Sequence, residues 1–280
     1  MNNYQSFFNQ KFISENQQII LPVLEEKNIE LFIKREDIIH PFISGNKFRK
    51  LKYNIEEAKI KNKTTLLTFG GAFSNHILAT AVAGALTGFK TIGIIRGDEL
   101  GNNLEKTLAY NATLREAHNN GMVFEFISRE NYRNKLSKVF IDSLIEKYND
   151  FYLIPEGGSN NLAVKGCQEI LQENDNQFNY ICVAVGTGGT IAGLINAANS
   201  SQKVIGFPAL KGDFLYDDIE RQINTNNFSL ETDYNFGGYA KYNEKLILFI
   251  NQFKEKTGVL LDPIYTGKMM FGVMDLIKKN

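Results

Sequence analysis

Apolar, β-prone runs alternate with helix-like segments along most of this 280-residue chain. Two of the runs, Thr64–Phe69 and Tyr180–Val185, lead directly into glycines, and a small, apolar helical segment follows each. Strand, glycine-rich turn and helix in this order build parallel sheets with ligand loops at the carboxyl ends of the strands. The chain is therefore predicted to be an α/β protein. The same patterns predict strands at 29–33, 64–69, 91–95, 123–127, 151–154, 180–185 and 204–207, and helices at 48–58, 77–86, 103–120, 135–148 and 191–196.

The turn after Val185 is the stronger of the two glycine loops. Backbone N–H groups at the start of the following helix favour an anion. No Gly-Lys-Ser/Thr follows, which excludes a nucleoside-triphosphate loop, and Ile191 stands where a dinucleotide fingerprint needs its third glycine. A bound monophosphate is predicted, with a nucleotide-binding α/β protein as the alternative. The residues of this loop are Gly186, Thr187, Gly188, Gly189 and Thr190.

Lys47 follows Gly45 and Asn46 and opens the segment with helical spacing at 48–58. The partial positive charge of a helix N-terminus opposes an ammonium, so the pKa of Lys47 is predicted to be lowered. An amine of lowered pKa can form a Schiff base with an aldehyde. The alternative is a solvated lysine, the usual state of this residue type. Lys47 is therefore the candidate nucleophile.

Ser74, Asn75 and His76 follow the first glycine loop, Gly70-Gly71, and precede the apolar helical segment. Ser74 or Asn75 is predicted to cap this helix, whose start can bind a carboxylate or phosphate. The alternative is an ordinary loop between a strand and a helix without a binding site, which explains the same spacing equally well.

Taken together, these segments resemble pyridoxal-phosphate enzymes of the tryptophan-synthase-β fold type, and more narrowly the 1-aminocyclopropane-1-carboxylate deaminase and D-cysteine desulfhydrase family. The resemblance spans nearly the whole chain in the family's order. It implies two three-layer αβα domains with mostly parallel sheets, a pyridoxal 5'-phosphate cofactor and a homodimer. The large cofactor-binding domain would comprise residues 1–47 and 151–280, and the small inserted domain residues 48–150. The matching segments are 33–37, 40–41, 44–47, 70–76, 155–160, 186–190, 238–239 and 262–268.

The resemblance also implies roles for single residues. Lys47 would bind the cofactor covalently and later move the substrate α-proton, and the 186–190 loop would hold the phosphate. Asn75 matches the position that hydrogen-bonds the cofactor's phenolic oxygen. The positions that match the substrate site are Ser74, Asn75 and His76 near the carboxylate, and Tyr239 and Tyr265 facing the substrate.

Two departures from the family pattern bear on activity. Thr266 stands where cyclopropane-opening members carry a glutamate that keeps the pyridine nitrogen protonated, and a hydroxyl cannot enforce that charge. Thr266 therefore favours β-elimination from D-cysteine or a related small D-amino acid over 1-aminocyclopropane-1-carboxylate deamination. The chain ends at Asn280, before a further strand and loop usual in the family. A pyridoxal-phosphate binder with little activity is therefore a second alternative.

Composition agrees with a cytoplasmic enzyme. Lys+Arg and Asp+Glu are both 31, so the formal net charge of +0 gives no global field for nucleic acid or an acidic membrane. The N-terminus lacks a basic and apolar export signal, and no run reaches the ~18 apolar residues of a membrane span. Cys167 and Cys182 are expected to be reduced and packed. The three histidines show no metal-ligand spacing, so no metal site is predicted.

Overall fold

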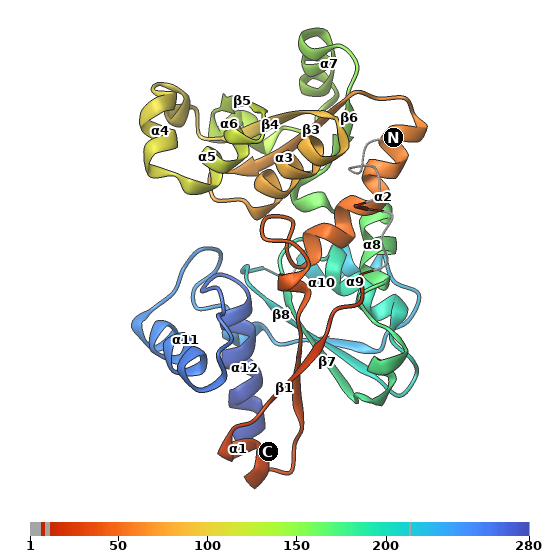
Figure 1. Cartoon of the computed structure of the whole chain (residues 1–280), viewed down its shortest axis with the longest axis vertical. Coiled ribbons are helices and arrows are strands. Elements are labelled where there is room, and N and C mark those ends of the chain that lie inside the picture. Colours follow the sequence, from red (N-terminus) through yellow and green to blue (C-terminus); the bar gives the residue numbers. More distant parts are fainter. Residues whose placement is uncertain (1–6, 9–11, 213, 280) are drawn as a thin grey trace. The chain divides into compact units, whose positions relative to one another are not determined.

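The computed structural model describes residues 7–8, 12–212 and 214–279. Two predictions concern residues outside this description. The prediction that residues 1–8 lack an export signal falls on described residues only at Phe7 and Phe8, and the chain end at Asn280 is not described. The chain divides into two compact units (Figure 1). Unit 1 comprises Met1–Ile13 and Glu36–Gly166, and unit 2 comprises Ser14–Arg35 and Cys167–Asn280.

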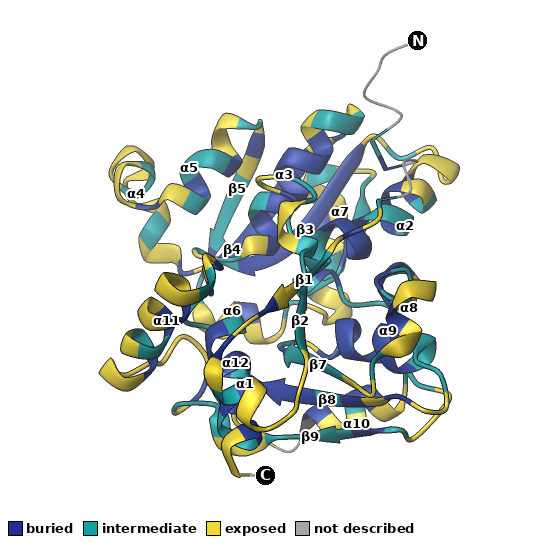
Figure 2. Ribbon diagram, turned by 60° about the horizontal axis from the view of Figure 1, so that its bottom comes forward, coloured by how far each residue is buried: buried dark blue, intermediate teal, exposed yellow. Residues whose placement is uncertain are grey.

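Among the described residues, the sheet of unit 1 has four parallel strands in the order β5-β4-β3-β6. Strand β3 is central and almost fully buried, so both of its faces need apolar cover (Figure 2). Its side chains alternate: Leu66 packs with α2 and α3, whereas Leu67 and Phe69 pack toward α6 and α7. Unit 1 is therefore a three-layer αβα arrangement. Its elements are α2 (Asn46–Ile60), β3 (Thr65–Gly71), α3 (Asn75–Thr87), β4 (Lys90–Arg96), α4 (Leu104–Tyr110), α5 (Ala112–Asn119), β5 (Met122–Ile127), α6 (Arg129–Arg133), α7 (Lys138–Tyr148) and β6 (Tyr152–Ile154), with short 3-10 turns η2 (Glu36–Ile38), η3 (Asp98–Gly101) and η4 (Glu156–Gly158).

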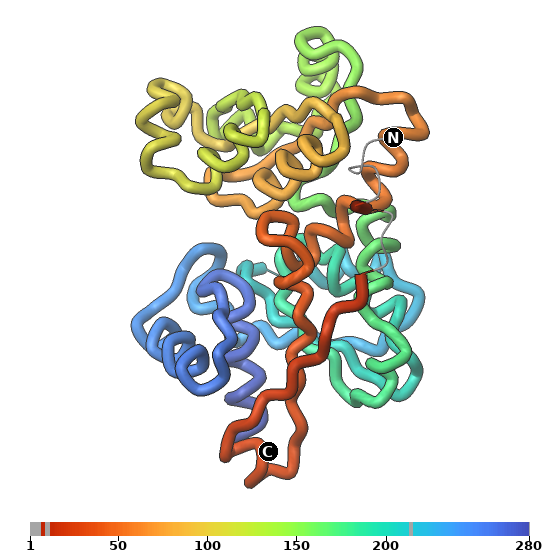
Figure 3. The backbone as a smooth tube through the Cα atoms, viewed as in Figure 1, coloured from red at the N-terminus to blue at the C-terminus, as the bar shows by residue number. Residues whose placement is uncertain are grey.

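Unit 2 contains a parallel sheet in the order β7-β8-β9 and an antiparallel pair of β1 with β2, which run side by side in the chain trace (Figure 3). Cys182 and Phe207 face helices α11 and α12, whereas Val185 and Val204 face α9 and α10. The sheet is thus covered on both faces. The elements are β1 (Asn16–Ile19), α1 (Pro22–Glu26), β2 (Leu31–Lys34), η5 (Glu173–Gln177), β7 (Tyr180–Val185), α9 (Gly189–Ala197), β8 (Lys203–Pro208), α10 (Phe214–Glu220), β9 (Phe228–Leu230), η6 (Thr232–Tyr234), α11 (Glu244–Thr257) and α12 (Thr266–Lys279), and α8 (Asn161–Gln168) joins the two units along the chain.

All seven predicted strands are present, and the parallel sheets are confirmed. The single helix predicted at 103–120 is wrong. The backbone of Asn111 is extended there (φ −113°, ψ 99°), and its side chain accepts the N–H of Leu114, so α4 ends and α5 begins. Strands β1 and β9 were not predicted, because short edge strands carry little apolar periodicity.

The boundaries of the compact units differ from the predicted domains. The predicted cofactor domain includes residues 1–13, 36–47 and 151–166, which belong to unit 1, whereas residues 14–35 belong to unit 2 together with residues 167–280. Side-chain contacts explain the first difference: Glu36 pairs with Arg49 of α2, and Asn160 bonds Asn54 of the same helix. Residues 48–150, the predicted inserted domain, thus form most of unit 1, which extends beyond them on both sides.

Helix α8 packs closely on α2 at Gly166. A Cβ atom at this position would lie 1.9 Å from the carbonyl oxygen of Arg49. No side chain can replace the glycine without moving one helix away from the other.

Gly166→Ala should therefore lower the free energy of unfolding by about 2 kcal/mol, since overpacking outweighs the ~1 kcal/mol that alanine gains over glycine in a helix. Urea denaturation at fixed pH measures the change. Glu56→Ala, at an exposed position of α2, is the control and should stay within about 0.5 kcal/mol of wild type. An unchanged or higher stability of Gly166→Ala would contradict the close packing.

Candidate functional site

Lys47 is the second residue of α2 and is half-buried, as predicted for the head of a helix. The turn before it depends on Gly45, whose φ of +58° suits glycine better than any other residue. The Gly45 N–H donates to the carbonyl oxygen of Glu36 at 2.9 Å. Lys47 Nζ donates to Asn46 Oδ1 at 2.9 Å. The amine therefore lies on a short, hydrogen-bonded turn.

A buried ion pair fastens this turn to α2. Arg49 Nε and Nη2 donate to the two carboxylate oxygens of Glu36 at 2.9 and 2.8 Å, and Nη2 also donates to the Phe12 carbonyl oxygen at 3.1 Å. Such bidentate pairing constrains geometry as well as charge. Arg49 and Glu36 thus hold both ends of the segment that presents Lys47.

The second glycine loop ends in a capped helix. Ser74 Oγ accepts the N–H of Ile77 at 3.4 Å, which confirms the predicted cap of α3. Asn75, the first helical residue, is exposed, whereas His76 is buried. The start of α3 therefore presents a hydroxyl, an amide and backbone N–H groups, a donor set that suits a carboxylate.

The hydrogen bonds of His76 define its tautomer. The Thr68 hydroxyl donates its one proton to the Ile154 carbonyl oxygen at 2.8 Å, so it accepts from Nε2 of His76, also at 2.8 Å. Nδ1 is then unprotonated. This nitrogen is buried and has no hydrogen-bond partner among the described residues.

Two ammonium groups of α2 act on His76. Burial holds the pKa of His76 well below its usual range, and the charges of Lys47 and Lys50 lower it further. Lys50 is itself buried, and its Nζ donates to the Gly157 carbonyl oxygen at 3.2 Å and to Ser159 Oγ at 3.0 Å. Unit 1 thus brings Lys47 and His76 into one electrostatic environment, in which the imidazole is neutral.

The phosphate loop predicted in unit 2 has the required shape. Gly188 (φ +81°) is the N-cap residue of α9 and has no side chain that could bond the first N–H groups of the helix, which are oriented toward the loop. A Cβ at Gly186 would lie 3.2 Å from Cε1 of Tyr265. The loop is therefore a small cradle of backbone donors, and a monophosphate fits this donor set.

Asp262 shapes the turn before α12. Its Oδ1 accepts the N–H groups of Ile264 and Tyr265 at 2.9 and 2.7 Å. Its Oδ2 accepts the Thr266 N–H at 2.9 Å and the Thr266 hydroxyl at 2.6 Å. The proton of the Thr266 hydroxyl is therefore committed to Asp262.

Tyr265 and Tyr239 lie together in unit 2. Their ring centroids are 6.2 Å apart, with the planes inclined by 60°. Because Tyr265 also contacts Gly186, the two tyrosines and the glycine loop form one group. The structure thus gathers the predicted residues into two sets: Lys47, Ser74, Asn75 and His76 in unit 1, and Tyr239, Tyr265, Thr266 and the 186–190 loop in unit 2.

Sequence reasoning assigned no role to Thr68, Asp262 or the Glu36–Arg49 pair. Only Asp262 had a usable signal, because an aspartate directly before Pro263 is typical of the start of a helix. The other contacts join residues distant in sequence, which a single sequence does not reveal.

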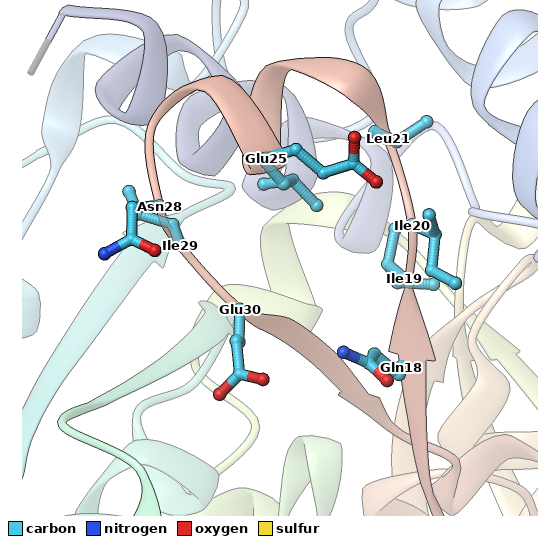
Figure 4. Close-up of a pocket in the computed structure, with 9 residues that line it drawn as sticks. Gln18, Ile19, Ile20, Leu21, Glu25, Asn28, Ile29 and Glu30 are labelled. Carbon is cyan, nitrogen blue, oxygen red and sulfur yellow. The ribbon is translucent and has the colours of Figure 1, made fainter.

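A shallow hollow of about 280 Å³ lies elsewhere, beside the link between β1 and β2 (Figure 4). It contains none of the predicted site residues. In the described part of the chain, no cluster of three or more His, Cys, Asp or Glu side chains could hold a metal ion. Cys167 is buried and Cys182 is partly buried. None of the helices described has the length and apolar character needed to cross a membrane.

Comparisons with known proteins agree with this geometry. Residues 16–280 match the profile of a family described as pyridoxal-phosphate dependent enzyme. A putative 1-aminocyclopropane-1-carboxylate deaminase of Pyrococcus furiosus is 32% identical over 275 residues, which cover 90% of this chain and 80% of the relative. A mitochondrial, bifunctional D-cysteine desulfhydrase/1-aminocyclopropane-1-carboxylate deaminase of Arabidopsis thaliana is also 32% identical, over 90% of this chain and 68% of its own length.

Solved structures share the fold. A crystal structure of an ACC deaminase homologue aligns with a TM-score of 0.78 at 24% identity, over 100% of this chain and 91% of its own. An O-acetylserine dependent cystathionine β-synthase from Helicobacter pylori aligns with a TM-score of 0.70 at 16% identity, over 100% and 92%. These likenesses confirm the predicted fold class. The chain belongs to the pyridoxal-phosphate dependent enzymes, with pyridoxal phosphate as its cofactor.

Proposed function

We propose that this enzyme is a lyase that eliminates the β-substituent of D-cysteine or a related small D-amino acid. For cysteine the balance is one amino acid and one water consumed, and pyruvate, ammonia and hydrogen sulfide released. The Cα–H and Cβ–S bonds break, and water replaces the amino nitrogen on the product carbon. Relatives named D-cysteine desulfhydrase and relatives named 1-aminocyclopropane-1-carboxylate deaminase both support this choice of substrate class.

Lys47 is the proposed catalytic base. Bound pyridoxal phosphate supplies an aldehyde for covalent attachment and an electron sink for the charge left on the substrate Cα. Lys47 Nζ would hold the cofactor in the resting enzyme and take the α-proton after the substrate amine displaces it. Support comes from the position of Lys47 on the Gly45 turn and from the Arg49–Glu36 pair that fixes this turn.

The substrate carboxylate is proposed to bind at the start of α3. Ser74 has a hydroxyl proton to donate, since the Ile77 N–H uses only an oxygen lone pair, and Asn75 adds an exposed amide. Neutral His76 presents a lone pair at Nδ1 and would repel a carboxylate there. Its proposed part is to accept a hydrogen bond at Nδ1 from an N–H or O–H group of the ligand or of a neighbouring lysine.

One observation carries the choice of elimination over cyclopropane opening: the Thr266 hydroxyl gives its proton to Asp262. With that proton committed, Thr266 cannot donate to the pyridine nitrogen, and its oxygen cannot enforce a positive charge there. The remaining proposed roles are phosphate binding by the 186–190 loop and proton-transfer assistance by Tyr239 and Tyr265. A cytoplasmic location and a homodimer also stay predictions.

Lys47→Ala should abolish the visible absorbance of the covalently bound cofactor and reduce turnover of D-cysteine by at least about a thousandfold, because it removes both the attachment point and the base. Absorbance spectra and sulfide release measure the two effects. Lys59→Ala, on an exposed site of the same helix, is the control and should match wild type. Unchanged turnover in Lys47→Ala would overturn the proposed role.

The purified enzyme should prefer D-cysteine to both L-cysteine and 1-aminocyclopropane-1-carboxylate by on the order of a hundredfold in kcat/KM. Keto-acid release from each compound, with sulfide release from the two cysteines, provides the comparison. Faster turnover of the cyclopropane would favour the deaminase activity instead. If the cofactor absorbance is present and none of the three is turned over, the elimination proposal fails.

His76 should make stability depend on pH. Its folded pKa lies below the unfolded value of about 6.5, so the unfolded state binds a proton that the folded state excludes, and stability falls as pH drops through that value. Wild type should lose about 1.4 kcal/mol more than His76→Gln between pH 7.5 and 5.5. Urea denaturation of both proteins at the two pH values measures this difference. Equal losses would show that the pKa of His76 is not lowered in the folded state.

A further inference from the structure

Lys268 is a buried cation on α12 for which the catalytic scheme above has no use. Only 2% of the residue is exposed, and its Nζ donates to the carbonyl oxygens of Asn235 and Gly238, each at 2.8 Å. Burial lowers the pKa of Lys268, while the charge of Asp262 acts in the opposite direction. Both carbonyl partners belong to the short segment that leads to Tyr239.

The placement of this lysine is unfavourable on local grounds. Lys268 is the third residue of α12, where the positive end of the helix dipole opposes a cation. Burying an ammonium adds a desolvation cost. A residue that breaks two local rules is expected where it serves a function or a particular contact. In this case the contact is the pair of loop carbonyls.

The segment 235–241, here termed the Tyr239 loop, has an unusual backbone. Four of its residues have positive φ: Phe236 (+53°), Gly237 (+95°), Gly238 (+111°) and Ala240 (+56°). Phe236 and Ala240 are not glycines, so this conformation costs free energy that contacts outside the loop must offset. Lys268 supplies two such contacts.

Helix α12 and the turn before it hold both tyrosines. Tyr265 is placed by the Asp262 turn directly before the helix, and Lys268 bonds the Tyr239 loop from the first turn. Phe236 adds an edge-to-face contact with Phe271 of the same helix, with centroids 5.1 Å apart. The separation of the two tyrosine rings is thus set by one rigid element.

We propose that Lys268 is a positioning residue that holds the Tyr239 loop, and through it the Tyr239 ring, against Tyr265. The idea that this ring pair faces the substrate rests on the proposed function. The loop-holding role does not, because it concerns contacts within the protein. The two parts therefore need separate readouts.

Trypsin cleavage after Lys241 tests the loop in the holoenzyme. Lys241 is exposed and closes the Tyr239 loop, so cleavage reports how often the loop opens. Lys268→Met should speed this cut by at least about tenfold, measured by mass spectrometry of the fragment that starts at Tyr242. Lys278→Met, at an exposed site near the end of α12, is the matched control and should cleave as wild type. Equal cleavage in Lys268→Met and wild type would overturn the proposal, whatever the enzyme's activity.

If Lys268→Met does not fold, Lys268→Gln replaces it. Glutamine retains an N–H donor of shorter reach, and faster cleavage after Lys241 is again expected.

Turnover measurements then distinguish a positioning role of Lys268 from general destabilisation of the protein. Lys268→Met should lower kcat for D-cysteine by on the order of a hundredfold with the cofactor absorbance retained, since misplacing a reacting group by about 1 Å has such an effect.

Tyr239→Phe completes the double-mutant cycle. If Lys268 acts through Tyr239, adding Tyr239→Phe to Lys268→Met should cause little further loss of kcat. Independent, multiplicative losses would show that Lys268 acts by another route. Absence of turnover in wild type would count against the proposed function alone, and the cleavage rate would still decide the loop-holding role.

Discussion

The geometry of unit 1 around the candidate nucleophile depends on one buried ion pair, that between Glu36 and Arg49. It joins the segment before α2 to α2 itself, through two hydrogen bonds of 2.8 and 2.9 Å. Removing one partner would leave a largely buried charge unpaired, which typically costs about 3–5 kcal/mol. Because Gly45 is also bonded to the backbone of Glu36, the position of Lys47 follows from this pair. The backbone of Lys47 is thereby held in place, so that its flexible side chain starts from a fixed position, as covalent chemistry on its amine requires.

In unit 2 the geometry depends on the carboxylate of Asp262, which accepts hydrogen bonds from several backbone N–H groups. Asp262 accepts from Ile264, Tyr265 and Thr266, and so defines how α12 starts. That start places Tyr265 beside Gly186, where a Cβ atom would lie 3.2 Å from the tyrosine ring, closer than ordinary van der Waals contact. The donor set for an anion and the aromatic pair are consequently built from the same few contacts. Unit 1 thus holds an amine and hydrogen-bond donors that suit a carboxylate, and unit 2 holds backbone donors that suit a phosphate together with the two tyrosines.

Much of this could be predicted from sequence because it is local. The run before Gly186 and the cap at Ser74 depend on periodicity and turn chemistry within a few residues, and both are confirmed. The break at Asn111 was missed because apolar spacing continues across it, while a side-chain cap overrides the helical pattern. The unit boundaries arise from contacts between residues distant in sequence, and the neutral state of His76 arises from its burial and from the charges of Lys47 and Lys50 on another helix. The assignment of substrate depends on Thr266, whose meaning comes from its bond to Asp262 and not from its type alone.

The central claim is that the amine of Lys47 carries the cofactor. Borohydride reduction of the purified holoenzyme, followed by proteolysis and peptide mass spectrometry, tests it directly by locating the reduced adduct. One phosphopyridoxyl group is expected, on the peptide that contains Lys47. An adduct on Lys50 or Lys268 with Lys47 unmodified would contradict the role of Lys47, and so would a holoenzyme that yields no adduct.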